Sequence, residues 1–395
     1  MIDKAIKMNS DCMGCHGCQN ICPKNCISME LDKEGFLYPN VNYDLCVKCN
    51  KCIDICPIIY KTSVDNTPVA YACINKNEEI RMASSSGGLF TLISKQVMDM
   101  RGVVFGASFN NKFELEHNYV YNAEDLSKLR GSKYLQSKIG YSFKLAKDFL
   151  DSGRKVLFSG TPCQIAGLQS YLMKPYDNLL TLDIICHGVP SPNVWRKYLE
   201  FRERESHSSI QRITFRQKNE GWKRFSVLFL FDNNTEYRRT LVEDLYMKAF
   251  LSDICLRPSC YNCKFKTLHR QSDMTLADFW GIENILPEMD DDKGTSLIFV
   301  NSKNGKEIFD SMSNDMIFTV VDINEAVKYN SAAIKSAKNN PNRDGFMKEK
   351  DNLPFDVLVR KYCPEPLQTR FMNKIRTGIK RCLVPHKRAT RQPGK

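Results

Sequence analysis

The sequence predicts an α+β fold in which a small cysteine-rich module precedes a larger mixed α/β core. The first observation is a pair of cysteine runs within 12–56 that share one spacing and lie 34 residues apart. The second is a strand–helix–strand pattern at 155–188, which favours parallel strands in one sheet. The third is an alternation of apolar residues at 210–242, typical of antiparallel strands. A chain of 395 residues is long enough for two or three such domains.

Both cysteine runs have the spacing C-x2-C-x2-C-x3-C followed by proline. In bacterial two-cluster ferredoxins, three cysteines of each run cap one [4Fe–4S] cluster and the fourth ligates the cluster of the other run. Zinc sites use pairs of ligands rather than triplets, and disulfide scaffolds are usually much shorter secreted chains. We therefore expect a ferredoxin-like domain with two clusters at residues 1–60. One cluster is expected on Cys12, Cys15, Cys18 and Cys56, and the other on Cys46, Cys49, Cys52 and Cys22.

Composition restricts the class of protein and its location. No apolar run approaches the ~20 residues of a membrane span, and we expect no signal peptide ahead of the first cysteine ligand. The chain contains 17 cysteines, which stay available to metal only where thiols remain reduced. A cytoplasmic protein, in an anaerobic host, is the expectation.

The net charge of +12 is unevenly distributed. Residues 366–395 contain basic side chains and no Asp or Glu. Such a basic tail suits peripheral contact with an anionic membrane or an acidic partner, and it equally suits a solvated terminus without any partner. No nucleic-acid-binding motif accompanies the charge, so nucleic acid is not an expected partner.

The core begins after a predicted linker at 61–68, with a buried strand at 69–74, a helix at 89–100 and a strand at 103–107. A loop rich in Ser and Gly opens the helix, and a second polar stretch lies at 130–137. Hydroxyls, free N–H groups and the positive end of a helix dipole suit a phosphate, but ordinary helix caps use the same residue types. The loop residues are Ser85, Ser86, Gly87 and Gly88, and the second stretch includes Ser132, Lys133 and Tyr134.

The strand–helix–strand pattern places two cysteines at one sheet edge. Cys163 follows the strand at 155–159 and lies in the first turn of the helix at 162–172, and Cys186 ends the strand at 179–186. Together with the pair Cys260-x2-Cys263 they supply four thiols. A C-x2-C pair alone also suits zinc or a redox disulfide, and Cys255 competes for one place. We interpret the four as a third [4Fe–4S] site. Between them an exposed helix is predicted at 193–205.

Several motifs together resemble the coenzyme F420 hydrogenase/dehydrogenase beta-subunit family, over nearly the whole chain up to about residue 350. They are Gly160-Thr161-Pro162-Cys163-Gln164, Cys186-His187-Gly188, Cys260-x2-Cys263 and Ala277-Asp278-Phe279-Trp280-Gly281, behind the two-cluster module. The resemblance implies an iron–sulfur flavoprotein that holds FAD beside a [4Fe–4S] cluster. The implied FAD contacts are Ser85, Ser86, Gly87, Gly88, Ser132, Lys133 and Tyr134, with Asp278 and Gly281 near the flavin or the cluster. The flavin-binding core is then divided at 69–150 and 151–350, and the third cluster lies in its second part.

The function that follows is an oxidoreductase. Electrons from a ferredoxin or another redox protein would pass through the clusters to FAD, and from there to a small organic substrate or a deazaflavin. Lys133 and His187 are the catalytic candidates, although His187 also suits a hydrogen-bonded turn. Two alternatives stay open: an electron-transfer subunit of a larger hydrogenase, dehydrogenase or reductase, and a non-catalytic iron–sulfur scaffold.

Overall fold

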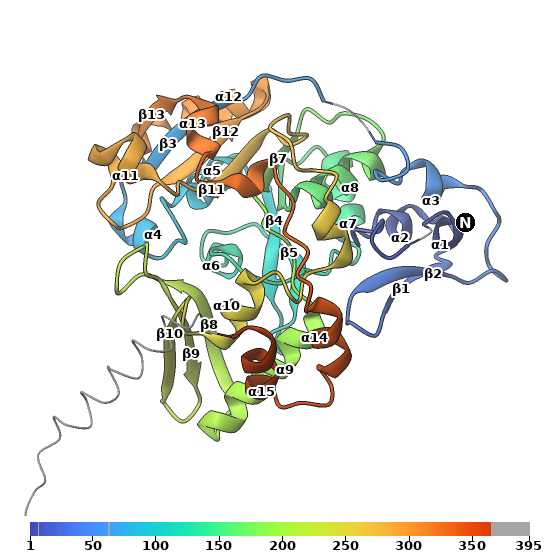
Figure 1. The fold of residues 1–395 in the computed structure, drawn as a ribbon. Coiled ribbons are helices and arrows are strands. Elements are labelled where there is room, and N and C mark those ends of the chain that lie inside the picture. The colour runs from blue at the N-terminus through green and yellow to red at the C-terminus, as the bar shows by residue number, and fades with distance from the viewer. Residues whose placement is uncertain (7, 62–63, 365–395) are drawn as a thin grey trace, which may run out of the picture.

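The computed structural model describes residues 1–6, 8–61 and 64–364. Within these residues the chain forms a small N-terminal module beside a larger core that contains two sheets, as Figure 1 shows. The coarse fold class, a mixed α/β core behind a ferredoxin-like module, is thus confirmed. The predicted basic tail at 366–395 and residues 62 and 63 of the predicted linker lie outside the described residues.

The N-terminal module is a two-stranded hairpin beside three short helices. The strands are β1 (Ile27–Leu31) and β2 (Leu37–Val41), which pair antiparallel, and the helices are α1 (Ile2–Ala5), α2 (Gly17–Ile21) and α3 (Lys51–Asp54). In the turn between the strands Gly35 adopts a φ of +88°, a value that favours glycine. Glu34 in this turn accepts a bond from Arg343 Nη1 at 3.0 Å, which ties the module to the core.

The larger sheet has eight strands in the order β13-β3-β12-β11-β7-β6-β4-β5. The strands are β3 (Val69–Asn75), β4 (Val103–Phe109), β5 (Leu115–Val120), β6 (Val156–Gly160), β7 (Leu179–Ile184), β11 (Met274–Asp278), β12 (Ser296–Val300) and β13 (Met316–Val321). β4, β6, β7 and β11 run parallel, and the other pairs are antiparallel. Helix α8 (Pro162–Leu172) joins β6 to β7, so the predicted parallel strand–helix–strand unit is confirmed.

Helices cover both faces of this sheet. Val104 and Leu157 face the cluster that contains α5 (Leu89–Asp99) and α12 (Lys303–Ser311), whereas Val103 and Phe158 face the one with α7 (Ser142–Asp151) and α8. The other helices are α4 (Glu78–Met82), α6 (Leu126–Leu129), α10 (Leu245–Leu251), α11 (Ile282–Ile285), α13 (Ile323–Val327), α14 (Arg343–Glu349) and α15 (Phe355–Tyr362). In the part of the chain that the structure describes, no helix has both the length and the apolar character needed to cross a bilayer.

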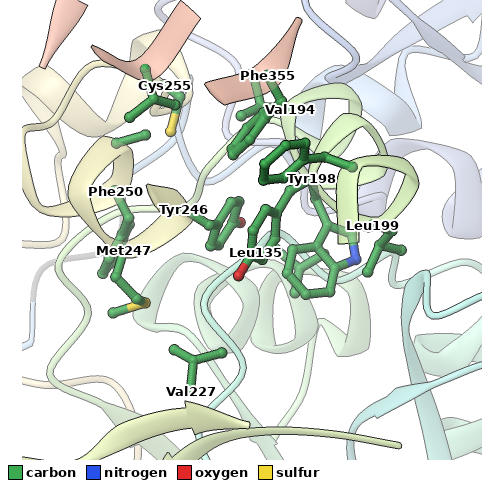
Figure 2. Close-up of a cluster of buried hydrophobic side chains, with 14 of the residues drawn as sticks. Leu135, Val194, Tyr198, Leu199, Val227, Tyr246, Met247, Phe250, Cys255 and Phe355 are labelled. Atoms are coloured by element: carbon green, nitrogen blue, oxygen red, sulfur yellow. The ribbon is translucent and has the colours of Figure 1, made fainter. Parts of the chain in front are cut away.

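The second core sheet is antiparallel, as predicted, and packs with helix α9 (Pro192–Ser206) in an aromatic core. Its strands are β8 (Ile210–Gln217), β9 (Ser226–Phe231) and β10 (Glu236–Thr240). The prediction of an exposed helix at 193–205 is wrong, because Tyr198 is completely buried and Trp195 is 2% exposed. Apolar residues recur every three or four positions along α9, and that stripe faces the core. Figure 2 shows Tyr198 beside Tyr246 and Phe355, with ring centroids 5.3 and 5.1 Å away.

Candidate functional site

The cysteines of the N-terminal module form two groups. Each group contains three cysteines of one run and the fourth cysteine of the other run. The second thiol group, which lines one cavity, is Cys46, Cys49, Cys52 and Cys22. The first thiol group is Cys12, Cys15, Cys18 and Cys56, whose charges act on one another. Burial raises the pKa of the Cys15 thiol to about 12, and the neighbouring Cys12 and Cys56 raise it too. A metal centre that compensates the negative charge would therefore favour the thiolate form of Cys15.

A fifth thiol lies in the cavity of the second thiol group. Cys26 is 5% exposed, and its Sγ lies 3.3 Å from Cys22 Sγ. Its backbone N–H also donates to Cys22 Sγ at 3.4 Å. Because Cys26 lies outside the ligand spacing, the sequence pattern alone does not reveal this contact.

The third thiol group is Cys163, Cys186, Cys260 and Cys263, which line one cavity of about 130 Å³. Cys163 begins α8 just beyond β6, and Cys186 lies two residues beyond β7. Cys260 lies in the 3₁₀ helix Pro258–Asn262, and Cys263 follows it. Parallel strands end at one edge of the sheet, so the fold brings the four predicted residues together.

Cys255 does not share this cavity. Its side chain is completely buried in the aromatic core, where Figure 2 shows it on the side of Phe250. The competition between Cys255 and the other cysteines for a place in the third thiol group is thus resolved by position. No three Cys, His, Asp or Glu side chains of the described residues are close enough to hold a single metal ion. The second and third thiol groups line cavities instead.

The third thiol group lies one helical turn from the first. Gly167 follows Cys163 by four residues on α8, and a Cβ on Gly167 would lie 2.8 Å from Cys15 Cβ and 2.9 Å from its Sγ. Four residues advance an α-helix by about 6 Å. Met13 and Ile58 of the N-terminal module pack in the same apolar cluster as Cys15, Cys163 and Cys263. The module therefore contacts the core at the third thiol group.

Lys266 and Arg270 of the core line the cavity of the third thiol group. Lys266 Nζ donates to the carbonyl oxygens of Cys186 and, at 2.7 Å, Ala332. Arg270 lies 3.7 Å from Asp183 in an ion pair that is almost completely buried. Both cations favour an anionic group in the cavity.

His187 lies at the edge of the same cavity. Its Nε2 is 2.5 Å from Asp253 Oδ1, and its ring packs edge-on against Phe250 with centroids 5.2 Å apart. His187 is therefore a hydrogen-bonded turn residue that also lines the cavity, and its catalytic role stays a prediction.

The two predicted flavin loops meet each other. Ser132 N donates to Ser85 Oγ at 2.6 Å, so the stretches 85–88 and 132–134 are adjacent. Arg216 links them to β11, because Nη1 donates to Tyr134 Oη at 3.1 Å and to Asp278 Oδ2 at 2.9 Å. The other amino group, Nη2, donates to the Ser85 carbonyl oxygen at 3.1 Å. Three of the predicted residues, Ser85, Tyr134 and Asp278, therefore contact one buried guanidinium.

The polar side chains of these loops are engaged within the protein. Ser86 Oγ donates to the carbonyl oxygen of Thr295 at 2.8 Å, and Gly87 N donates to Ser296 Oγ at 2.9 Å. A Cβ at Gly87 would overlap the Cys73 carbonyl oxygen, so close packing requires this glycine. Helix α5 begins at Gly88 without a side-chain cap. What the loop can still offer an anion is the start of this helix.

Gly281 packs against Tyr329. It has a φ of +81°, and a Cβ there would overlap the ring of Tyr329. Tight packing under Tyr329 is thus a sufficient reason for glycine at this position.

Two lysines hold backbone carbonyls beside the loops. Lys133 Nζ donates to the carbonyl oxygens of Leu129 and Arg130, both at 3.1 Å, and burial lowers the pKa of Lys133 to about 7. Lys218 Nζ donates to the carbonyl oxygens of Arg81 at 2.8 Å and Ser86 at 3.0 Å, and burial lowers its pKa to about 7 as well.

Sequence reasoning missed Arg216 and Lys218. Arg216 lies near the end of β8 and Lys218 just beyond it, and the alternation of this strand indicated only an antiparallel sheet. A basic residue that alternates into the interior of such a strand is the signal that was available.

Comparison with known proteins identifies two parts of the chain. Residues 11–58 match a family model described as a 4Fe-4S dicluster domain, and residues 153–326 match one that describes the C terminus of the Coenzyme F420 hydrogenase/dehydrogenase beta subunit. Residues 153–326 thus resemble the C-terminal region of the coenzyme F420 hydrogenase/dehydrogenase beta-subunit family. The resemblance found in the sequence is confirmed. The first match contains the first and second thiol groups, and the second contains the third thiol group.

The individual proteins that resemble this chain either share little sequence identity with it or match only a short segment. An F(420)H(2) dehydrogenase subunit from Methanosarcina mazei is 22% identical over 165 residues, which cover 39% of this chain and 46% of that protein. The ferredoxin-type protein NapF of Haemophilus influenzae is 41% identical over 44 residues, 11% of this chain and 25% of that protein. The chain thus spans less than half the length of these curated relatives.

A solved structure is similar over a longer stretch. A chain of the F420-reducing [NiFe] hydrogenase complex from Methanosarcina barkeri has a TM-score of 0.49 and 15% sequence identity, with 73% of this chain and 94% of that chain covered.

Proposed function

We propose that this protein is an iron–sulfur oxidoreductase in which the first and second thiol groups hold [4Fe–4S] clusters that exchange electrons with a third cluster and a flavin. The observation that carries the proposal is the position of the third thiol group. Four thiols from two strand ends and one 3₁₀ helix line a single cavity, one helical turn from Cys15. Four thiolates are the ligand set of a cubane cluster.

The proposed order of electron transfer through the clusters follows from how exposed their cysteines are. Cys49 of the second thiol group is exposed, whereas Cys15 of the first packs against α8 beside Cys163. A redox partner would therefore reach the second cluster from solvent, and electrons would continue through the first cluster to the third. A ferredoxin or a similar small redox protein is the proposed partner.

FAD is proposed at the meeting point of the stretches 85–88 and 132–134. The uncapped start of α5 supplies backbone N–H groups for a phosphate, and Arg216 adds a buried cation whose Nε has no hydrogen-bond partner in the described residues. Bound there, a flavin accepts single electrons from clusters and exchanges electron pairs with an organic substrate. The residues of the chain would hold it through the α5 start, Tyr134 and the Arg216–Asp278 pair. Lys133 and His187 stay the proposed side chains for substrate contact.

A second candidate is an electron-transfer subunit of a larger complex. It is favoured by the relative from Methanosarcina mazei, which is named as a subunit of a dehydrogenase. The two candidates differ in what the isolated chain does, because a subunit would pass electrons to an artificial acceptor but would reduce no organic substrate until it is assembled. A non-catalytic scaffold would do neither.

The experiment is rapid mixing of the anaerobically purified holoprotein with reduced ferredoxin, followed by absorbance and electron paramagnetic resonance. We expect the N-terminal clusters to be reduced in both the wild type and Cys163→Ala, and the flavin only in the wild type. The matched control is Cys73→Ala, which also removes a buried thiol but from β3, outside the three thiol groups. A Cys163→Ala protein that delivers electrons to the flavin as fast as Cys73→Ala would contradict the proposed path.

A further inference from the structure

Arg257 is a completely buried cation that touches both the first and the third thiol group. Its Nε donates to the carbonyl oxygen of Cys12 at 2.8 Å, which fixes the loop of the first group. Its own carbonyl oxygen accepts from the N–H of Cys260 at 2.9 Å, in the third group, and its side chain lines that group's cavity. One residue thus connects the two neighbouring cluster sites.

The guanidinium has only neutral partners. Nη1 donates to Gln136 Oε1 at 3.0 Å and Nη2 donates to the carbonyl oxygen of Leu37 at 2.9 Å. The guanidinium carbon also lies 4.3 Å from the ring centroid of Tyr38. Among the described residues no carboxylate forms an ion pair with Arg257. Hydrogen bonds and a ring face therefore satisfy the geometry of this group but leave its charge uncompensated.

Two other buried arginines, Arg343 and Arg216, each have a carboxylate partner. Arg343 donates to Glu34 at 3.0 Å and Arg216 donates to Asp278 at 2.9 Å. A buried charge without a counter-charge is costly, because the interior solvates it poorly. The chain therefore needs a negative group close to Arg257.

We propose that Arg257 is the shared counter-cation of the first and third clusters and raises the reduction potentials of both. The inference rests on the proposed function. A cluster with four thiolate ligands is an anion and becomes more negative when it takes up one electron, so a fixed cation nearby stabilises the reduced form. Lys266 and Arg270 contact the cavity of the third thiol group only, whereas Arg257 spans both sites.

The test is a potentiometric titration of the anaerobic holoprotein, with dithionite as the electron source and paramagnetic resonance as the readout. In Arg257→Gln the midpoint potentials of the first and third clusters should become more negative than in the wild type. The second cluster is an internal control and should keep its potential. Its signal is assigned beforehand with Cys49→Ala.

Three further variants separate charge from contact geometry. Arg257→Lys keeps the charge but loses the three-way fork, and Gln136→Ala removes one partner without changing the charge; both should stay close to the wild-type potentials. Arg343→Gln combined with Glu34→Gln removes a compensated ion pair without changing the net charge, and it should leave the first and third potentials unchanged. If Arg257→Gln does not fold, Arg257→Lys still tests the proposal, because it keeps the positive charge and should keep the midpoint potentials of the first and third clusters.

Unchanged potentials in Arg257→Gln would overturn the proposal. So would a shift in Arg257→Lys or Gln136→Ala as large as in Arg257→Gln, or an equal shift of all three clusters. If the wild type shows no third cluster, the proposed function fails, whereas the inference about Arg257 is still judged on the first cluster alone.

Discussion

The thiol of Cys163 owes its position to its neighbours in the first turn of α8. Thr161 and Gln164 form a reciprocal cap at the start of this helix, and Pro162 occupies the first turn. Thr161 Oγ1 lies 3.1 Å from Cys163 Sγ, so the capping residue also contacts the thiol. Cap, proline and cysteine are all visible in the sequence, and for this reason the sequence predicted both the helix and the place of the thiol.

Lys133 is the residue whose protonation should be unusual. Burial lowers its pKa to about 7, so its amine is protonated below that pH and becomes a free nucleophile as the pH rises through it. We expect acylation of Lys133 by an amine-reactive ester to be half-maximal at about pH 7, measured by peptide mass spectrometry between pH 6 and 10.

The reference peptide for this measurement contains Lys303, whose side chain is 92% exposed. Ordinary exposed lysines react mainly near pH ~10. Acylation of Lys133 that follows the reference peptide across the whole range would show that its amine is not perturbed.

At the scale of elements, α8 is the part of the core that holds the N-terminal module in contact with the third thiol group. A glycine in a helix interior usually costs stability relative to alanine, about 1 kcal/mol. Gly167 is retained at the point where Cys15 approaches, and no larger side chain fits there. The close approach of two proposed cluster sites is therefore the physical reason for this residue.

Gly167→Ala should separate the module from α8. The new Cβ would lie 2.8 Å from Cys15 Cβ, and overpacking of this kind typically costs ~1–3 kcal/mol, more than the ~1 kcal/mol that alanine gains in a helix. We expect a net destabilisation of about 1 kcal/mol in urea unfolding, and a weaker magnetic interaction between the first and third clusters.

Ser170→Ala on the same helix is the matched control. It changes helix propensity in the same direction, and no contact of Ser170 with Cys15 is present. Equal stability and equal magnetic interaction in the two variants would disprove the contact role of Gly167.

The sequence predicted some helices and strands more accurately than others. The bounds of α8 match the prediction, which placed Pro162 in the first turn of the helix. The strands β8, β9 and β10 were recognised from alternation alone. Helix α9 was predicted to be exposed, although its apolar stripe around Trp195 is present in the sequence and packs in the aromatic core.

At the scale of the whole molecule, long-range pairing could not be read from the sequence. The order of the eight-stranded sheet places β3 between β12 and β13, which follow it by more than 200 residues. No local pattern specifies such partners. The same limit applies to the site: the cysteines were found by spacing, whereas the partners of Arg216 and Arg257 are distant in the sequence and follow only from the structure.

The net charge of +12 predicts how the protein meets an acidic electron donor. Lys24, Lys48 and Lys51 are exposed beside the second thiol group, close to the exposed Cys49. The second-order rate constant for reduction by an acidic ferredoxin should fall as salt increases, because screening shortens from ~10 Å at 0.1 M to ~3 Å at 1 M.

A neutral redox dye is the control for this prediction, and its rate should not depend on salt. Removal of residues 366–395 separates the contribution of the basic tail from that of the lysines in the module. A rate with ferredoxin that is independent of salt would exclude electrostatic docking.

The central claim is that Cys163, Cys186, Cys260 and Cys263 hold a third cluster, and the most direct test is to count iron and sulfide. After anaerobic purification the wild type should contain about twelve irons per chain, as three four-iron clusters require. Cys260→Ala combined with Cys263→Ala should contain about eight, whereas Cys255→Ala, whose thiol lies outside the cavity, should keep about twelve. About eight irons in the wild type, or a loss in Cys255→Ala as large as in the double variant, would contradict the account.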